Sequence, residues 1–129
     1  DAQRAEIESA SPSDAITAAA HQVAHSIGAV AIGTYTTSGS TTLRASRERP
    51  DVPILCFARS IAISRRMMLA YGVQSVVTTV PDGFRAKIDA AVACAAARGV
   101  AEPGDLLVVT AGDGVTGSTN VLRIAAVDR

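Results

Sequence analysis

Two adjoining segments, Val30-Ala31-Ile32-Gly33-Thr34-Tyr35 and Thr36-Thr37-Ser38-Gly39-Ser40-Thr41, read as a strand and the turn that follows it. The first segment is apolar and predicts a β-strand, and the second is rich in hydroxyls and precedes a predicted helix. Hydroxyls and backbone N–H groups converge at such a turn, where the helix dipole favours an anion. The same residue types also suit an ordinary turn or helix cap. The stretch therefore predicts a strand–turn–helix unit with a candidate phosphate-binding turn.

The composition indicates one globular domain with no general attraction to nucleic acid or membrane. Of the 129 residues, 48% are hydrophobic, which is enough to build a core. The 12 basic and 12 acidic residues cancel, so no net field draws a polyanion or an anionic membrane. Aromatic residues make up only 3% of the chain, which argues against base-stacking platforms. We expect neither nucleic acid nor membrane as a partner.

Targeting signals and cysteine usage favour the cytoplasm. No apolar run approaches the length of a membrane span, and no signal peptide opens the chain. Cys56 and Cys94 lie in apolar surroundings without a disulfide framework, so we expect buried, reduced thiols. We therefore expect a cytoplasmic protein.

His21 and His25 are four residues apart on a predicted helix and so share one face. This spacing occurs in zinc sites, but no third ligand is evident and no Glu follows His21. We therefore expect a surface or interface pair, and no metal site.

Hydrophobic patterns on both sides of the first stretch predict alternating helices and strands. The predicted helices cover residues 12–27, 41–48, 60–71 and 81–98, and the predicted strands cover residues 30–35, 53–58, 73–80, 106–110 and 121–127. Such alternation gives a parallel sheet with helices on both faces. The short connection before the last strand makes that strand antiparallel. The prediction is an α/β protein, a three-layer α/β/α sandwich whose five-stranded mixed sheet has four parallel strands and one antiparallel edge strand.

Two predicted helices carry an apolar stripe at helical spacing, which is the face expected to enter the core. In the first helix the stripe consists of Ile16, Ala20, Val23 and Ile27; in the last it consists of Phe84, Ile88, Val92 and Ala95. Residues 1–11 are polar and predict a linker or junction arm, which leaves residues 12–129 as the domain.

Three motifs occur in a specific order along the chain. The turn Thr36–Thr41 comes first, and Ala97-Arg98-Gly99 ends the last predicted helix. Gly104-Asp105-Leu106-Leu107-Val108-Val109-Thr110-Ala111-Gly112 then leads to Gly117-Ser118-Thr119-Asn120. In this order and spacing, residues 12–127 resemble the C-terminal regulatory domain of pyruvate kinase.

This resemblance implies that catalysis takes place elsewhere. The family transfers a phosphoryl group from phosphoenolpyruvate to ADP in a (β/α)₈ barrel that uses Mg and K, and such a barrel needs about 250 residues. The resemblance therefore implies no catalytic residue, metal or cofactor in this domain. It implies instead a regulatory role in glycolysis and a homo-oligomer formed through the domain.

The resemblance also implies a phosphorylated effector, such as fructose 1,6-bisphosphate, AMP or a sugar monophosphate. One phosphate would bind the turn formed by Thr36, Thr37, Ser38, Gly39, Ser40 and Thr41. The second would meet a basic residue at the position of Lys87, and the glycine-rich loop with Gly114 and Gly117. Asp113 in that loop opposes a second phosphate. A bisphosphate, a monophosphate, a nucleotide and no effector therefore all stay open.

Two other interpretations remain beside this one. A free-standing protein of the same fold would bind a phosphorylated metabolite for an unrelated purpose. A flavodoxin-like FMN carrier has a similar phosphate turn, but a helix precedes the first strand here and aromatic residues to sandwich a flavin are missing. Because the chain begins at Asp1 and not at Met, we expect a piece of a longer polypeptide.

Overall fold

The computed structural model describes residues 12–36, 51–58, 61–67, 72–78, 83–112 and 119–128. The elements in chain order are α2 (Pro12–Ile27), β1 (Ala31–Thr36), β2 (Ile54–Ala58), α4 (Ile61–Met67), β3 (Val73–Val77), α5 (Phe84–Ala97), β4 (Leu106–Ala111) and β5 (Val121–Ala126). The predicted arm 1–11 and the predicted helix 41–48 lie outside the described residues.

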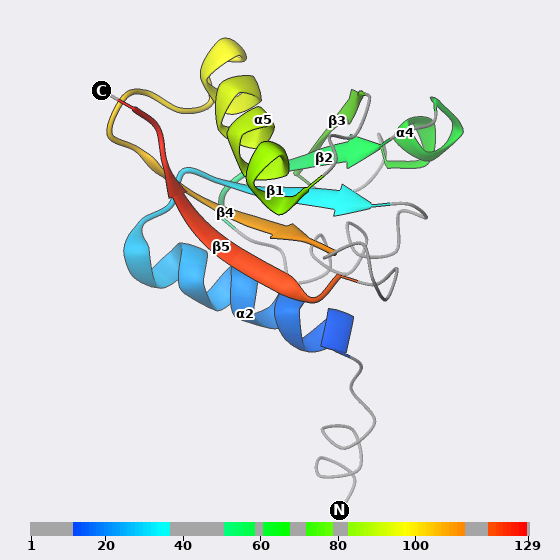
Figure 1. Ribbon diagram of the computed structural model, residues 1–129, viewed down its shortest axis with the longest axis horizontal. Helices are drawn as coiled ribbons and strands as arrows, with labels where there is room; N and C mark the ends of the chain where they lie inside the picture. The colour runs from blue at the N-terminus through cyan, green and yellow to red at the C-terminus, as the bar shows by residue number, and fades with distance from the viewer. Residues whose placement is uncertain are drawn as a thin grey trace, which may run out of the picture.

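The five strands form one mixed sheet in the order β3-β2-β1-β4-β5. The pairs β1–β2, β2–β3 and β1–β4 are parallel, and β4–β5 is antiparallel. Figure 1 shows α5 on one face of the sheet and α2 on the other. The predicted three-layer α/β fold with one antiparallel edge strand is thus confirmed.

The strand order places a topological switch point between β1 and β4. From β1 the chain proceeds to β2 and β3 on one side, then returns to β4 on the other side. β1 and β4 pair directly, with Ala31 opposite Leu107 and Thr34 opposite Thr110. In open α/β sheets, ligands bind in the crevice at the carboxyl ends of such a pair.

The central strands are buried on both faces, as strands covered by two helical layers are. All five residues of β2 are buried, and so are residues 107–111 of β4. Leu55 and Phe57 pack in the cluster under α5, whereas Ile54 packs in the cluster under α2. A Cβ on Gly33 would lie 3.4 Å from the Phe57 ring and 3.7 Å from the Ala91 Cβ of α5. Gly33 thereby allows α5 to lie close to the sheet.

The core face of α2 differs from the predicted one. Its buried residues are Ser13, Thr17, Ala20 and Ala24, so only Ala20 of the predicted stripe is fully buried. The three bulky residues of that stripe, Ile16, Val23 and Ile27, flank the contact and are half-buried. Small and hydroxyl-bearing side chains let the helix approach the sheet closely. Their polar atoms find partners, because Ser13 Oγ donates to the Thr119 carbonyl (3.2 Å) and Thr17 Oγ1 donates to the Ser13 carbonyl (2.8 Å).

The predicted stripe of α5 agrees much better with the structure. Ile88 and Ala95 are buried together with Ala91, and Phe84 and Val92 are half-buried against the same cluster. Here the largest side chains point at the sheet, so the apolar pattern marks the true contact face. The buried residues of this cluster that lie on the sheet come from β1, β2, β4 and β5.

Candidate functional site

Lys87 lies on the first turn of α5, at the carboxyl ends of β1 and β4. Its ammonium Nζ donates to the carbonyl oxygen of Gly112, the residue directly after β4, at 3.3 Å. The same Nζ lies 6.0 Å from the ring centroid of Tyr35, the penultimate residue of β1. A positive charge is therefore placed at the switch point, where the sheet topology favours a ligand site.

Tyr35 connects β1 to the same turn of α5. Its hydroxyl donates to the Lys87 carbonyl oxygen at 2.7 Å. Its ring stacks on Phe57 of β2, with centroids 4.7 Å apart and an interplanar angle of 21°. Burial, with a smaller contribution from nearby Cys94, raises the pKa of the Tyr35 hydroxyl to about 12. The hydroxyl therefore stays protonated and able to donate at neutral pH.

The structure describes only part of the site predicted from the sequence. It includes Lys87 and the backbone of Thr36, which ends β1. The other predicted residues lie outside the described residues: Thr37, Ser38, Gly39, Ser40, Thr41, Gly114 and Gly117. Lys87 sits between the points where β1 leads into the predicted phosphate turn and where Gly112 leads into the glycine-rich loop.

Sequence reasoning missed Tyr35 as a residue of this site. The apolar pattern places Tyr35 in the strand before the predicted turn and predicts nothing about a partner for its hydroxyl. Its hydrogen bond reaches a residue 52 positions away, which depends on how α5 crosses the sheet. The signal that could have found it is the place of Tyr35 at the carboxyl end of β1. Polar side chains at the carboxyl end of a strand beside a switch point lie next to the ligand site.

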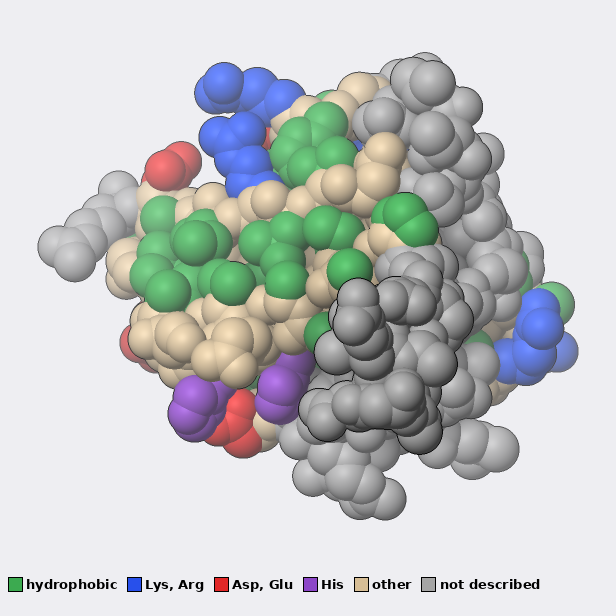
Figure 2. Space-filling view, turned by 90° about the horizontal axis from the view of Figure 1, so that it is seen from below, with side chains coloured by type: hydrophobic (Ala, Val, Ile, Leu, Met, Phe, Trp, Pro, Cys, Tyr) green, Lys and Arg blue, Asp and Glu red, His purple; other side chains and the backbone are tan. Residues whose placement is uncertain are grey.

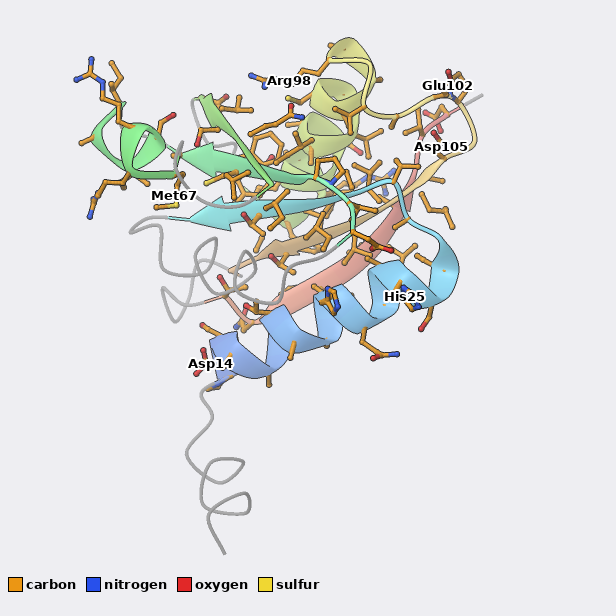
Figure 3. The ribbon with its side chains drawn as sticks, turned by 180° about the vertical axis from the view of Figure 1, so that it is seen from behind. Asp14, His25, Met67, Arg98, Glu102 and Asp105 are labelled. Carbon is orange, nitrogen blue, oxygen red and sulfur yellow. The ribbon has the colours of Figure 1, made fainter. Side chains whose placement is uncertain are left out.

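The motif around Gly104 and Asp105 has a structural role at the opposite end of β4. Asp105 accepts a hydrogen bond on Oδ2 from the Glu102 backbone N–H at 2.8 Å. The Asp105 N–H in turn donates to the Glu102 carbonyl at 3.0 Å. Figure 3 shows both acidic side chains at this turn. The Asp105 carboxylate and the Glu102 backbone close the turn that leads into β4, at the opposite end of that strand from Lys87.

The two histidines of α2 lie in different surroundings. His25 Nδ1 lies 3.7 Å from Asp51 Oδ2, with both side chains about 70% exposed, so the contact is a weak surface one. His21 instead lines a small cavity under α2 with Thr17, Thr34 and Thr110. Within the described ranges, no three His, Cys, Asp or Glu side chains come together as metal ligands would. None of the described helices is long and apolar enough to cross a membrane.

Fold and site together define a doubly wound α/β domain with a cation at its switch point. The chain belongs to the pyruvate kinase family, because residues 14–125 match the model of the pyruvate kinase alpha/beta domain. This confirms the resemblance seen in the motifs.

Several pyruvate kinases are similar to most of this chain. It is 38% identical to pyruvate kinase from Methylorubrum extorquens over 130 residues, which are 99% of this chain and 27% of that protein. It is 33% identical to pyruvate kinase 2 from Synechocystis sp. over 126 residues, which are 96% of this chain and 21% of that protein. The crystal structure of a pyruvate kinase from Cryptosporidium parvum matches with a TM-score of 0.83 at 25% identity, covering 92% of this chain and 23% of that one. The chain thus spans about a quarter of the length of these relatives.

Proposed function

We propose that this chain is the C-terminal regulatory domain of a pyruvate kinase and binds a phosphorylated effector at the carboxyl ends of β1 and β4. The observation that carries the proposal is the Lys87 ammonium, which lies between those two strand ends. In the whole protein, transfer of phosphoryl from phosphoenolpyruvate to ADP would take place on residues outside this chain. The free thiols of Cys56 and Cys94 suit the reducing cytoplasm, where we place the enzyme.

The surroundings of Lys87 favour an anion. The described contact of Nζ is to a neutral carbonyl, so it does not neutralise the ammonium charge. Lys87 also lies on the first turn of α5, where the helix dipole adds to the positive potential. The N-cap residue Gly83 makes no side-chain hydrogen bond to that turn. A phosphate would therefore meet a cation close to the positive end of a helix dipole.

The phosphate group is the chemistry that the candidate effectors share. We propose that it binds between Lys87 and the turn made by Thr36, Thr37, Ser38, Gly39, Ser40 and Thr41. Gly114 and Gly117 would allow the second loop to approach it closely. Asp113, in that same loop, disfavours a second phosphate by like-charge repulsion. A sugar monophosphate or a nucleotide therefore fits the residues better than a bisphosphate.

Thermal unfolding with three probes tests this proposal. Inorganic phosphate, AMP and fructose 1,6-bisphosphate are each added at constant ionic strength, and the Tm of the whole chain is measured. At ten times Kd, binding stabilises by about 1.4 kcal/mol, which corresponds to about 3–7 °C in a domain of this size. The ranking of the probes identifies the effector class. No shift with any probe at millimolar concentration would contradict the proposal.

Matched charge variants locate the site. Lys87→Met should reduce the shift strongly, and Ser38→Asp should abolish it through like-charge repulsion. Arg65→Met is the control, because it removes the same charge from an exposed position on α4. An equal loss in Arg65→Met and Lys87→Met would indicate a general charge effect and no specific site.

We also propose that the domain forms a homo-oligomer through β5 and α2. β5 is the last strand in the sheet order, and its residue Ile124 is 47% exposed. Figure 2 shows hydrophobic side chains gathered over the face that α2 and β5 present. An unpaired edge beside apolar surface is suited to pairing with a second copy.

A further inference from the structure

Two contacts from one side chain hold Lys87 in place. The Tyr35 hydroxyl fixes the Lys87 backbone through the 2.7 Å bond to its carbonyl. The Tyr35 ring lies beneath the Lys87 ammonium, with 6.0 Å between Nζ and the ring centroid. A cation at this distance from an aromatic face is attracted by the ring quadrupole. Tyr35 therefore acts on both ends of the same lysine.

Tyr35 is itself held firmly, so it is a suitable reference point. Its side chain is buried, and it stacks on Phe57, which is its direct partner in the β1–β2 register. Gly33, two residues earlier on the same face of β1, leaves room for the Phe57 ring and for Ala91 of α5. The pKa of about 12 means that the hydroxyl keeps its proton, and thus the bond to Lys87, at neutral and mildly alkaline pH.

We propose that Tyr35 is the positioning residue of the anion site and holds the Lys87 ammonium between the carboxyl ends of β1 and β4. The inference rests on the proposed function, because positioning matters only if Lys87 meets an anion. A free lysine side chain has many rotamers, and binding must select one of them. The Tyr35 hydroxyl holds the Lys87 backbone, and the Tyr35 ring attracts the ammonium before the anion arrives. The anion therefore binds a prearranged cation.

The first test measures the Kd of inorganic phosphate in Tyr35→Phe. This variant keeps the stacked ring and loses only the hydroxyl. We expect Kd to rise about three- to tenfold, the factor that corresponds to losing one neutral hydrogen bond. In Lys87→Met, the added Tyr35→Phe change should have no further effect on Kd, because the group that Tyr35 positions is gone.

Val108→Ala is the matched control for stability. Val108 is fully buried in the cluster under α2, on the other face of the sheet from Tyr35. Its truncation should lower Tm while leaving the phosphate Kd unchanged. A Kd that rises equally in Val108→Ala and Tyr35→Phe would overturn the positioning role, because both changes would then act through stability alone.

A second readout needs no anion. Lys87 is the single lysine of the chain, so modification by an amine-reactive ester, measured by peptide mass spectrometry, reports on this side chain. Tyr35→Phe should speed modification of Lys87 by a factor similar to the change in Kd, because the ammonium is less often held against the ring and the Gly112 carbonyl.

The outcomes separate the two proposals. If phosphate binds the wild type and depends on Lys87, but Tyr35→Phe changes neither Kd nor labelling, Tyr35 is not a positioning residue and the proposed function stands. If the wild type binds none of inorganic phosphate, AMP and fructose 1,6-bisphosphate, the proposed function fails. Labelling then decides alone: a faster reaction in Tyr35→Phe supports the hold on Lys87, and an unchanged rate overturns it.

Discussion

At the scale of single residues, Thr110 carries a buried hydroxyl that lowers the stability of the fold. Its side chain is 1% exposed, and among the described residues Oγ1 has no hydrogen-bond partner in the cavity under α2. An unsatisfied buried polar group costs about 1–3 kcal/mol. Thr110→Val keeps the shape and removes that cost. We expect the free energy of unfolding in urea to rise by about 1 kcal/mol.

Thr17 provides the matched control for this prediction. It is buried in the same cavity, but its Oγ1 donates to the Ser13 carbonyl at 2.8 Å. Thr17→Val should therefore lower the free energy of unfolding by about 1 kcal/mol, since it removes a hydrogen bond that is made. The prediction is wrong if both variants are destabilised alike.

The Tyr35 hydroxyl should make stability depend on alkaline pH. Its pKa is raised from 10.0 to about 12 in the folded chain, so the unfolded chain loses the proton first. The stabilisation is therefore complete below about pH 10 and declines as the pH rises toward about 12, by about 1–3 kcal/mol in total. Urea unfolding across this range should show a steeper decline in the wild type than in Tyr35→Phe. Equal slopes would contradict the raised pKa.

The sequence predicted one of the two residues that form the described part of the candidate site. Lys87 was predicted as a basic residue on a late helix, and it does lie at the carboxyl ends of β1 and β4. Tyr35 was not predicted as a site residue. Its hydroxyl donates to a carbonyl on α5, and this contact depends on how α5 packs across β1 in the tertiary structure. The strand pattern of residues 30–35 predicted burial of the ring and nothing about its polar end.

At the scale of elements, α2 illustrates how a correct helix can have a wrong predicted face. The bounds 12–27 were predicted and are observed. The apolar period predicts a core face with Ile16 and Val23, whereas the structure buries Thr17 and Ala24 and leaves those two half-buried. Hydrophobic periodicity assigns the core face to the largest apolar side chains, whereas a helix that packs closely on a sheet needs small side chains at the contact. In α5 the same method worked, because Ile88 is both bulky and central.

Overpacking of α2 tests this close contact. Ala24 is 3% exposed and faces the sheet. Ala24→Leu forces extra atoms into a packed interface and should lower the free energy of unfolding by about 1–3 kcal/mol. Ala19→Leu is the control on the exposed face of the same helix and should change it by less than about 0.5 kcal/mol. Similar values for the two variants, measured in urea, would show that α2 tolerates bulk on its core face.

At the scale of the whole molecule, the layers and the strand directions could be predicted from the sequence, and the strand order comes from the structure. Alternating helices and strands require parallel crossovers, whereas a strand that follows a short connection runs antiparallel, as β5 does beside β4. The strand order β3-β2-β1-β4-β5 then creates the switch point at which Lys87 lies. The surfaces through which two copies would pair are indicated by apolar side chains that stay exposed in the single chain.

Two exposed isoleucines allow that assembly to be tested. Ile124 is 47% exposed on the edge strand β5, and Ile61 is 59% exposed on α4, beside the opposite edge of the sheet. Ile124→Glu would bury an unpaired carboxylate in a β5 interface, which costs about 3 kcal/mol or more and should weaken self-association by about two orders of magnitude. Ile61→Glu makes the same chemical change away from that interface and should leave the sedimentation profile of the wild type unchanged. If Ile61→Glu dissociates the oligomer and Ile124→Glu does not, the chain assembles through the α4 edge, and the hydrophobic face of α2 and β5 has another role.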